Sequence, residues 1–176
     1  MMQMRDRCAA LLLLLALCSC GEDRAETPYG DAERVAAYRA EIAPLIAEIN
    51  DIEQALRAMA VGSTDRATGA NLAAACQVLD ARLVAVLDRL DSVSPPRKLK
   101  QMHADMRTAV ELRQRACVHI AAGWQIEQDQ SFEVAESFYL EAEALLAEAN
   151  VRLLAVDRVL GEIDVALGQH ATSPTA

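Results

Sequence analysis

A group of soft metal ligands stands in the middle of the chain, formed by Met102, His103 and Met106. At helical spacing these side chains share one side of a helix, where thioether and imidazole groups could hold copper or non-covalent haem. The same residue types are also typical of core packing around one hydrogen-bonded imidazole. We favour the packing interpretation and keep the ligand site as the alternative.

A second ambiguous residue is Arg113, which falls about 40° from the centre of an apolar stripe at roughly 100° per residue. Helical heights place it near Asn50 or Glu53 of an earlier helix and near Glu148 or Asn150 of a later one. The guanidinium is either a buried polar group that is paired, with an anionic ligand as one further option, or it snorkels into water. We favour snorkelling.

The sequence contains no recognisable catalytic constellation. None of His103, His119 and His170 has Glu three residues before it, as di-iron bundles require, and no Cys-x-x-Cys-His motif is present. His119 falls nearly opposite Cys117 on the helix and is predicted to be solvated. We therefore predict a protein that is not an enzyme and that needs no cofactor.

Composition favours closely packed helices. Apolar residues make up 53% of the chain but aromatic residues only 3%, with seven Gly and five Pro. The formal net charge of −9 disfavours binding to nucleic acid.

Apolar residues after residue 30 recur at alternating spacings of three and four, which predicts helices. We call each such stripe a seam. The seams run from Val35 to Met59, from Leu72 to Val93, from Leu99 to Trp124 and from Phe132 to Leu167. Pro44 lies inside the first seam without changing its phase, so a kink is expected there. Gly62-Ser63-Thr64 and Ser94-Pro95-Pro96 mark breaks, and Ser94 is expected to cap a helix that begins at Pro95.

Four comparable helices with short connections predict an all-α, up-down-up-down four-helix bundle with heptad-like seams over residues 31–168. The alternative is a long helical hairpin that completes its core by dimerising. Trp124 is expected to close the core beside Phe132, and residues 169–176 to form a flexible tail. Glu148 and Arg152 are typical of a solvated outer face.

The N-terminus combines Arg5 and Arg7 with an apolar run from Ala9 to Leu17. The following Leu17-Cys18-Ser19-Cys20 resembles the lipobox of bacterial lipoproteins. That resemblance implies a signal peptide over residues 1–19, a diacylglycerol and further acyl chain on Cys20, and membrane anchoring through them. Gly21 then implies the outer membrane, facing the periplasm, in a two-membrane cell. Residues 20–30 are predicted to be a flexible tether.

Two cysteines, Cys76 and Cys117, remain after removal of the signal peptide and acylation of Cys20. Both lie on apolar seams, at similar heights on either side of the turn near Pro95. An exported chain meets oxidising conditions, so we predict a structural disulfide between them, with two buried free thiols as the alternative. The sequence thus favours an envelope lipoprotein with a structural or protein-interaction role. The alternative is a carrier of a small ligand, copper or haem, and the partner protein is not identified.

Overall fold

The computed structural model describes residues 25–60 and 66–172. Four helices make up most of these residues: α2 (Ala32–Ala60), α3 (Arg66–Ser92), α4 (Lys100–Asp129) and α5 (Phe132–Thr172). They pack against one another around a shared apolar core, which confirms the predicted all-α four-helix bundle. The predicted signal peptide, Cys20, the break at residues 62–64 and the last residues of the tail lie outside the described residues.

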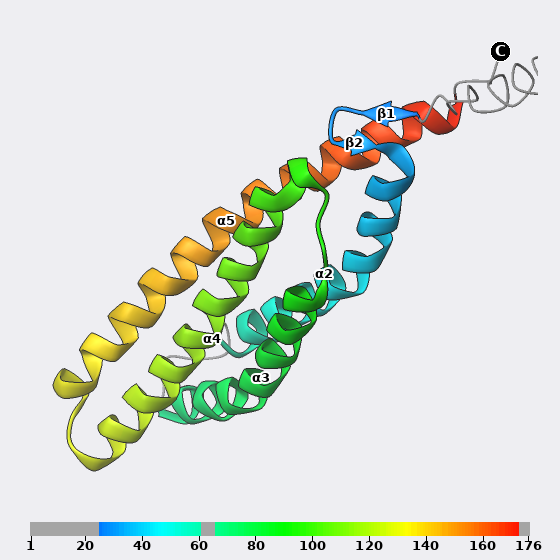
Figure 1. The fold of residues 1–176 in the computed structure, drawn as a ribbon. Coiled ribbons are helices and arrows are strands. Elements are labelled where there is room, and N and C mark those ends of the chain that lie inside the picture. The colour runs from blue at the N-terminus through cyan, green and yellow to red at the C-terminus, as the bar shows by residue number, and fades with distance from the viewer. Residues whose placement is uncertain (1–24, 61–65, 173–176) are drawn as a thin grey trace, which may run out of the picture.

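Successive helices run back and forth (Figure 1). Between α3 and α4, for example, Asp80 meets Gln114 and Asp91 meets Arg107, so the residue numbers rise on one helix as they fall on the other. Helices α4 and α5 lie side by side along most of the length of α4, and α2 with α3 forms the other hairpin.

The seams predicted from the sequence are the buried faces of the helices. In α2, the seam residues from Val35 to Leu56 are all buried. Helix α2 continues through Pro44 without a restart, and its ribbon bends partway along (Figure 1), as a proline inside a helix favours. The seam's last residue, Met59, has its side chain outside the described part.

The connection from α3 to α4 differs from the prediction. Helix α3 ends at Ser92, and a short 3-10 helix, η1 (Arg97–Leu99), precedes α4. Ser94 is exposed, and Pro96 occupies the N-cap position of η1 without a side-chain cap hydrogen bond. The second proline of the pair therefore takes the place expected for Ser94, because residues before a proline are driven into extended backbone.

Residues 25–30 are not the flexible tether that the sequence predicted. Strands β1 (Glu26–Thr27) and β2 (Gly30–Asp31) form a small antiparallel hairpin, in which Gly30 adopts a positive φ of 118°. The Thr27 hydroxyl donates to the Gly30 carbonyl at 2.9 Å, and Lys98 Nζ donates to the Pro28 carbonyl at 2.9 Å. The Tyr29 hydroxyl donates to the Glu162 carboxylate of α5. Only residues 20–24 of the predicted tether remain outside the described chain.

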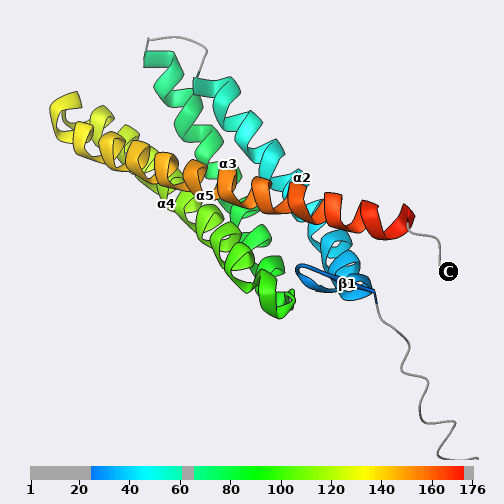
Figure 2. The same ribbon diagram turned by 90° about the horizontal axis from the view of Figure 1, so that it is seen from above.

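The bundle is closed at one end and open at the other. At the closed end, the hairpin and the start of α2 lie against the C-terminal part of α5, where Arg39 Nε pairs with Asp164 at 2.9 Å. At the open end, the joined ends of α2 and α3 diverge from the turn between α4 and α5 (Figure 2). Helix α5 continues to Thr172, beyond the predicted end of the bundle at residue 168.

Within α3, the stretch Gly69–Ser92 is long and apolar enough to cross a membrane by length and composition, with mean hydropathy 1.5. The core helices of water-soluble proteins pass the same test. Its seam residues Leu79, Leu83, Val86 and Leu90 are buried inside the bundle.

Candidate functional site

Arg113 is buried on α4, with only 2% of its surface exposed. Its Nη2 donates to Glu53 Oε2 of α2 at 2.8 Å and to Asn150 Oδ1 of α5 at 3.1 Å, and Nη1 approaches the Ile49 carbonyl at 3.5 Å. The neighbours predicted from helical heights are thus confirmed. The favoured snorkelling interpretation is wrong, because groups of α2 and α5 bind the Arg113 guanidinium and the side chain is only 2% exposed.

A chain of ion pairs connects the buried Arg113 guanidinium to the protein surface. Glu53 is 24% exposed, and its other oxygen pairs with Arg57, which is 72% exposed. Burial alone would raise the pKa of the Glu53 carboxyl, but the hydrogen bonds and charges of Arg113 and Arg57 together lower it. Glu53 therefore stays ionised and neutralises a cation that would be costly to bury alone.

An apolar cleft opens beside this ion pair, between α2 and α3 on one side and α4 and α5 on the other. It comprises two adjoining cavities of about 150 and 380 Å³ that share Leu72, Ile120, Leu146 and Asn150 among their lining residues. Arg113 and Glu53 line the smaller cavity, and Tyr139 lines the larger one. The arrangement can take up a small apolar group. The Tyr139 hydroxyl of the larger cavity donates to the Glu127 carboxylate at 2.8 Å.

His103 lies in the core near the closed end, together with Met102 and Met106. Its Nε2 lies 3.1 Å from the Leu90 carbonyl oxygen, which can only accept, so Nε2 donates. In the neutral tautomer that this contact selects, Nδ1 accepts from the Tyr38 hydroxyl at 3.0 Å. Burial raises the pKa of Tyr38, which keeps this hydroxyl protonated. Both ring nitrogens are engaged, which supports the packing interpretation over the ligand site.

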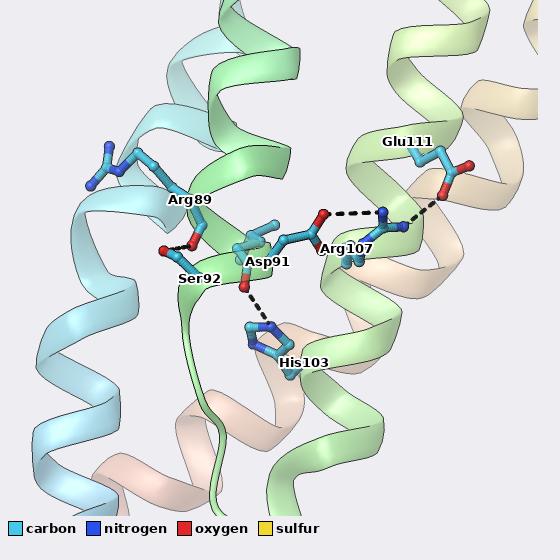
Figure 3. A network of polar contacts seen from close by, with 7 residues as sticks. Arg89, Asp91, Ser92, His103, Arg107 and Glu111 are labelled. Atoms are coloured by element: carbon cyan, nitrogen blue, oxygen red, sulfur yellow. Dashed lines mark hydrogen bonds and ion pairs between the residues drawn. The ribbon is translucent and has the colours of Figure 1, made fainter.

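Figure 3 shows the surroundings of His103 where α3 ends. The imidazole reaches from α4 toward the last turn of α3, while Arg107 on α4 pairs with Asp91 at 2.6 Å and with Glu111 at 2.9 Å. These ion pairs are exposed, so they contribute little to stability and add no reactive group to the site.

The structure brings Cys76 and Cys117 together, as the helical heights predicted, but as free buried thiols. The hydrogen bond to Cys117, followed by burial, raises the pKa of the Cys76 thiol. The same hydrogen bond lowers the pKa of the Cys117 thiol, so the two thiols are not equivalent, and burial limits the access of reagents to both. A hollow of about 250 Å³ borders both cysteines. The predicted disulfide is not present in this structure, and its formation in an oxidising compartment stays a prediction.

Trp124 does not close the core in the way the sequence predicted. It packs against α3 at Gly69, where an added Cβ would lie 2.6 Å from Trp124 Cζ3. Phe132 is exposed and stacks on Tyr139, with ring centroids 6.2 Å apart. The glycine, which the seam analysis left unused, makes room for the indole.

His119 is half-buried, so the prediction of a solvated imidazole is wrong. Helix α5 covers this side of α4, and Phe138 and Glu141 lie beside the ring. Among the described residues, Nδ1 of His119 is a buried nitrogen without a hydrogen-bond partner. The error arose because the prediction assigned α4 one buried face, whereas α3 and α5 cover two.

The outward face of α5 is the main feature that the sequence interpretation missed. Six of the nine large apolar side chains that are exposed in the described residues belong to this helix: Phe132, Val134, Leu140, Val151, Leu154 and Val165. The pairing of Glu148 with Arg152 is present, at 2.8 Å. The expected charged face, however, also carries an apolar stripe. A second run of alternating three and four spacings in the sequence would have revealed it.

Comparisons with known proteins identify no relative: no family model, no curated protein and no solved structure matches this chain.

Proposed function

We propose that this protein is a lipid-anchored envelope lipoprotein whose helical bundle binds a protein partner on the outward face of α5. The observation that carries the proposal is the exposed apolar stripe, in which Leu140, Val151, Leu154 and Val165 are all exposed. Exposed large apolar side chains gathered on one helix can mark an interaction site.

The remaining features fit a binding role without catalysis. The buried polar residues of the core, Arg113 and His103, are occupied by other protein groups. The resemblance of Leu17-Cys18-Ser19-Cys20 to a lipobox supports the anchor, and the outer membrane is the proposed location in a two-membrane cell.

Metabolic labelling with a palmitate analogue tests the anchor. We expect the wild-type chain to take up label and to fractionate with membranes, and Cys20→Ser to lose both properties. Cys18→Ser is the matched control, because it changes the neighbouring cysteine and should leave labelling intact. Retained labelling in Cys20→Ser would contradict the anchor.

Site-specific photocrosslinking in cells tests the docking face. A photoreactive amino acid at Leu154 is expected to give protein adducts of discrete mass. The control position is Val78 on α3, which is similarly exposed, at 68% against 70% for Leu154. Absence of adducts at Leu154, or the same adducts at both positions, would contradict a docking role for α5.

The apolar cleft favours a second candidate function, the carriage of a small apolar ligand. The fluorescent probe 1-anilinonaphthalene-8-sulfonate would report it: binding should be stoichiometric and weakened in Leu146→Trp, which places a larger side chain where the two cavities adjoin. If the probe binds Leu146→Trp as well as the wild type, the cleft is not the site.

A further inference from the structure

We propose that the partner of α5 is an amphipathic helix with basic flanks, and not a second copy of this chain. This inference rests on the proposed docking function and adds the chemistry of the partner. The surface concerned, here called the outer seam, consists of residues on α5 whose side chains or backbone are all exposed: Leu140, Ala144, Ala147, Val151, Leu154, Arg158, Gly161, Val165 and Gly168.

The spacing of the outer seam selects a helical partner. Its members alternate at four and three residues from 140 to 168, a strict heptad repeat, and extend over about 42 Å at ~1.5 Å per residue. Such a stripe drifts by about 20° per heptad around a straight helix, so a second helix can follow it by winding left-handed. Small residues such as Ala144, Ala147 and Gly161 would let the partner's backbone approach closely.

The flanks of the outer seam are acidic on both sides. With the seam residues as positions a and d of the heptad, the flanking g positions include Glu143, Asp157 and Asp164, and the flanking e positions on the other edge include Glu141, Glu148 and Glu162. Lys and Arg are absent from these e and g positions, and Arg152, which follows Val151, is already paired with Glu148 and Asp105. Some of these carboxylates pair with neighbours, but Glu143 and Asp157 form no ion pair in the described part of the chain. The surface beside the seam is therefore left negative.

A second copy of the chain fits this charge pattern badly. In a parallel or an antiparallel pair of outer seams, flanking carboxylates would face flanking carboxylates, and like charges at these positions direct helices away from self-pairing. Lys or Arg at the flanks of a partner helix would complement them. The same acidic edges repel anionic lipid headgroups, so a membrane surface is also disfavoured.

Arg158 lies within the outer seam and would be covered on docking. Its Nε lies 4.0 Å from the Glu162 carboxylate, a long ion pair, so we expect an acidic or carbonyl group of the partner opposite Arg158 to complete its pairing when it is covered. A single polar residue in a seam of this kind fixes the register of the two helices. The outer seam thus specifies a partner with basic flanks and one acidic residue in its apolar stripe.

Two synthetic helical peptides test this chemistry with the full chain purified in detergent. Both carry Leu at the seam positions and one Glu opposite Arg158, and they differ only in having Lys or Glu at the flanking positions. Fluorescence anisotropy should show the Lys peptide binding at least about tenfold more tightly, which corresponds to ~1.4 kcal/mol, and binding should weaken with added salt. The double variant Val151→Glu/Leu154→Glu should lose binding, whereas Val78→Glu on α3 should retain it.

Equal affinity for the two peptides, or binding of neither, would overturn the proposed partner chemistry. So would a dimer of the full chain, seen by light scattering, that Val151→Glu/Leu154→Glu dissociates. In any of these cases, adducts at Leu154 in the photocrosslinking experiment would still uphold α5 as a docking face. If those adducts are missing as well, the proposed function fails together with the inference.

Discussion

Two buried polar side chains on α4, His103 and Arg113, find partners for their polar atoms in different ways. His103 lies near the closed end, where the Tyr38 hydroxyl and the Leu90 carbonyl engage its two ring nitrogens. Arg113 lies toward the open end, where it needs the carboxylate of Glu53, the amide of Asn150 and a backbone carbonyl. The closed end thus accommodates a polar group with hydrogen bonds alone, whereas the open end holds a charge and must balance it. The two sites should therefore respond very differently to substitution.

Arg113→Ala is expected to have the largest effect. It leaves Glu53 half-buried without its inner partner, so the free energy of unfolding should fall by about 3–5 kcal/mol in urea denaturation. The control is the double variant Arg113→Met/Glu53→Met, which removes both charges and should be far less destabilised. If the double variant is as unstable as Arg113→Ala, the ion pair is not the cause.

His103→Leu should cost less, about 1–3 kcal/mol, because it leaves a buried hydroxyl and a buried carbonyl without partners but no unbalanced charge. The same urea titration gives the value. Adding Tyr38→Phe to His103→Leu should recover part of the loss, since one stranded group is then removed. If His103→Leu lowers the free energy of unfolding as much as Arg113→Ala does, the two sites do not differ as we propose.

Gly69→Ala tests how tightly the open end is packed. The new Cβ would meet the edge of the Trp124 indole at 2.6 Å and push it outward. Overpacking typically costs about 1–3 kcal/mol, and the better helix propensity of Ala returns about 1, so we expect a net loss of about 0–2 kcal/mol. Emission of Trp124, the only tryptophan, should shift to longer wavelength. Gly161→Ala is the control, because nothing lies within 4 Å of its added Cβ.

The pH dependence of stability should report on the Arg113 site through Glu53. Because the folded-state pKa of Glu53 is lowered from 4.5, its contribution is fully present above the unfolded value and is lost as pH falls through the folded value. Thermal denaturation below pH 5 should show a smaller acid-induced loss in Glu53→Gln than in the wild type. Glu33→Gln, an exposed substitution on α2, should follow the wild-type curve.

The heptad seams were readable from the sequence because the positions from Val35 to Leu56, and their counterparts on the other helices, each face one common core. Helical heights also brought Arg113 to Glu53 and Asn150, since rise per residue is nearly constant. Whether Arg113 is buried depends on how closely α2 and α5 approach it, which spacing does not encode. His119 and the hairpin at residues 26–31 were missed for the same reason: both depend on contacts with α5, far away in the sequence.

The small hairpin at residues 26–31 determines the end of the bundle from which the N-terminal segment leaves. Because Tyr29 is held against Glu162 of α5, the chain leaves the bundle at the closed end. With the proposed lipid on Cys20, residues 20–25 reach at most about 17 Å at ~3.4 Å per residue, so the closed end stays near the membrane. Along α5, Leu140 at the far end of the outer seam lies about 33 Å beyond Glu162 at ~1.5 Å per residue. With the tether at full length, the whole outer seam would then lie within roughly 50 Å of the lipid surface, and a partner's binding helix must reach into this zone.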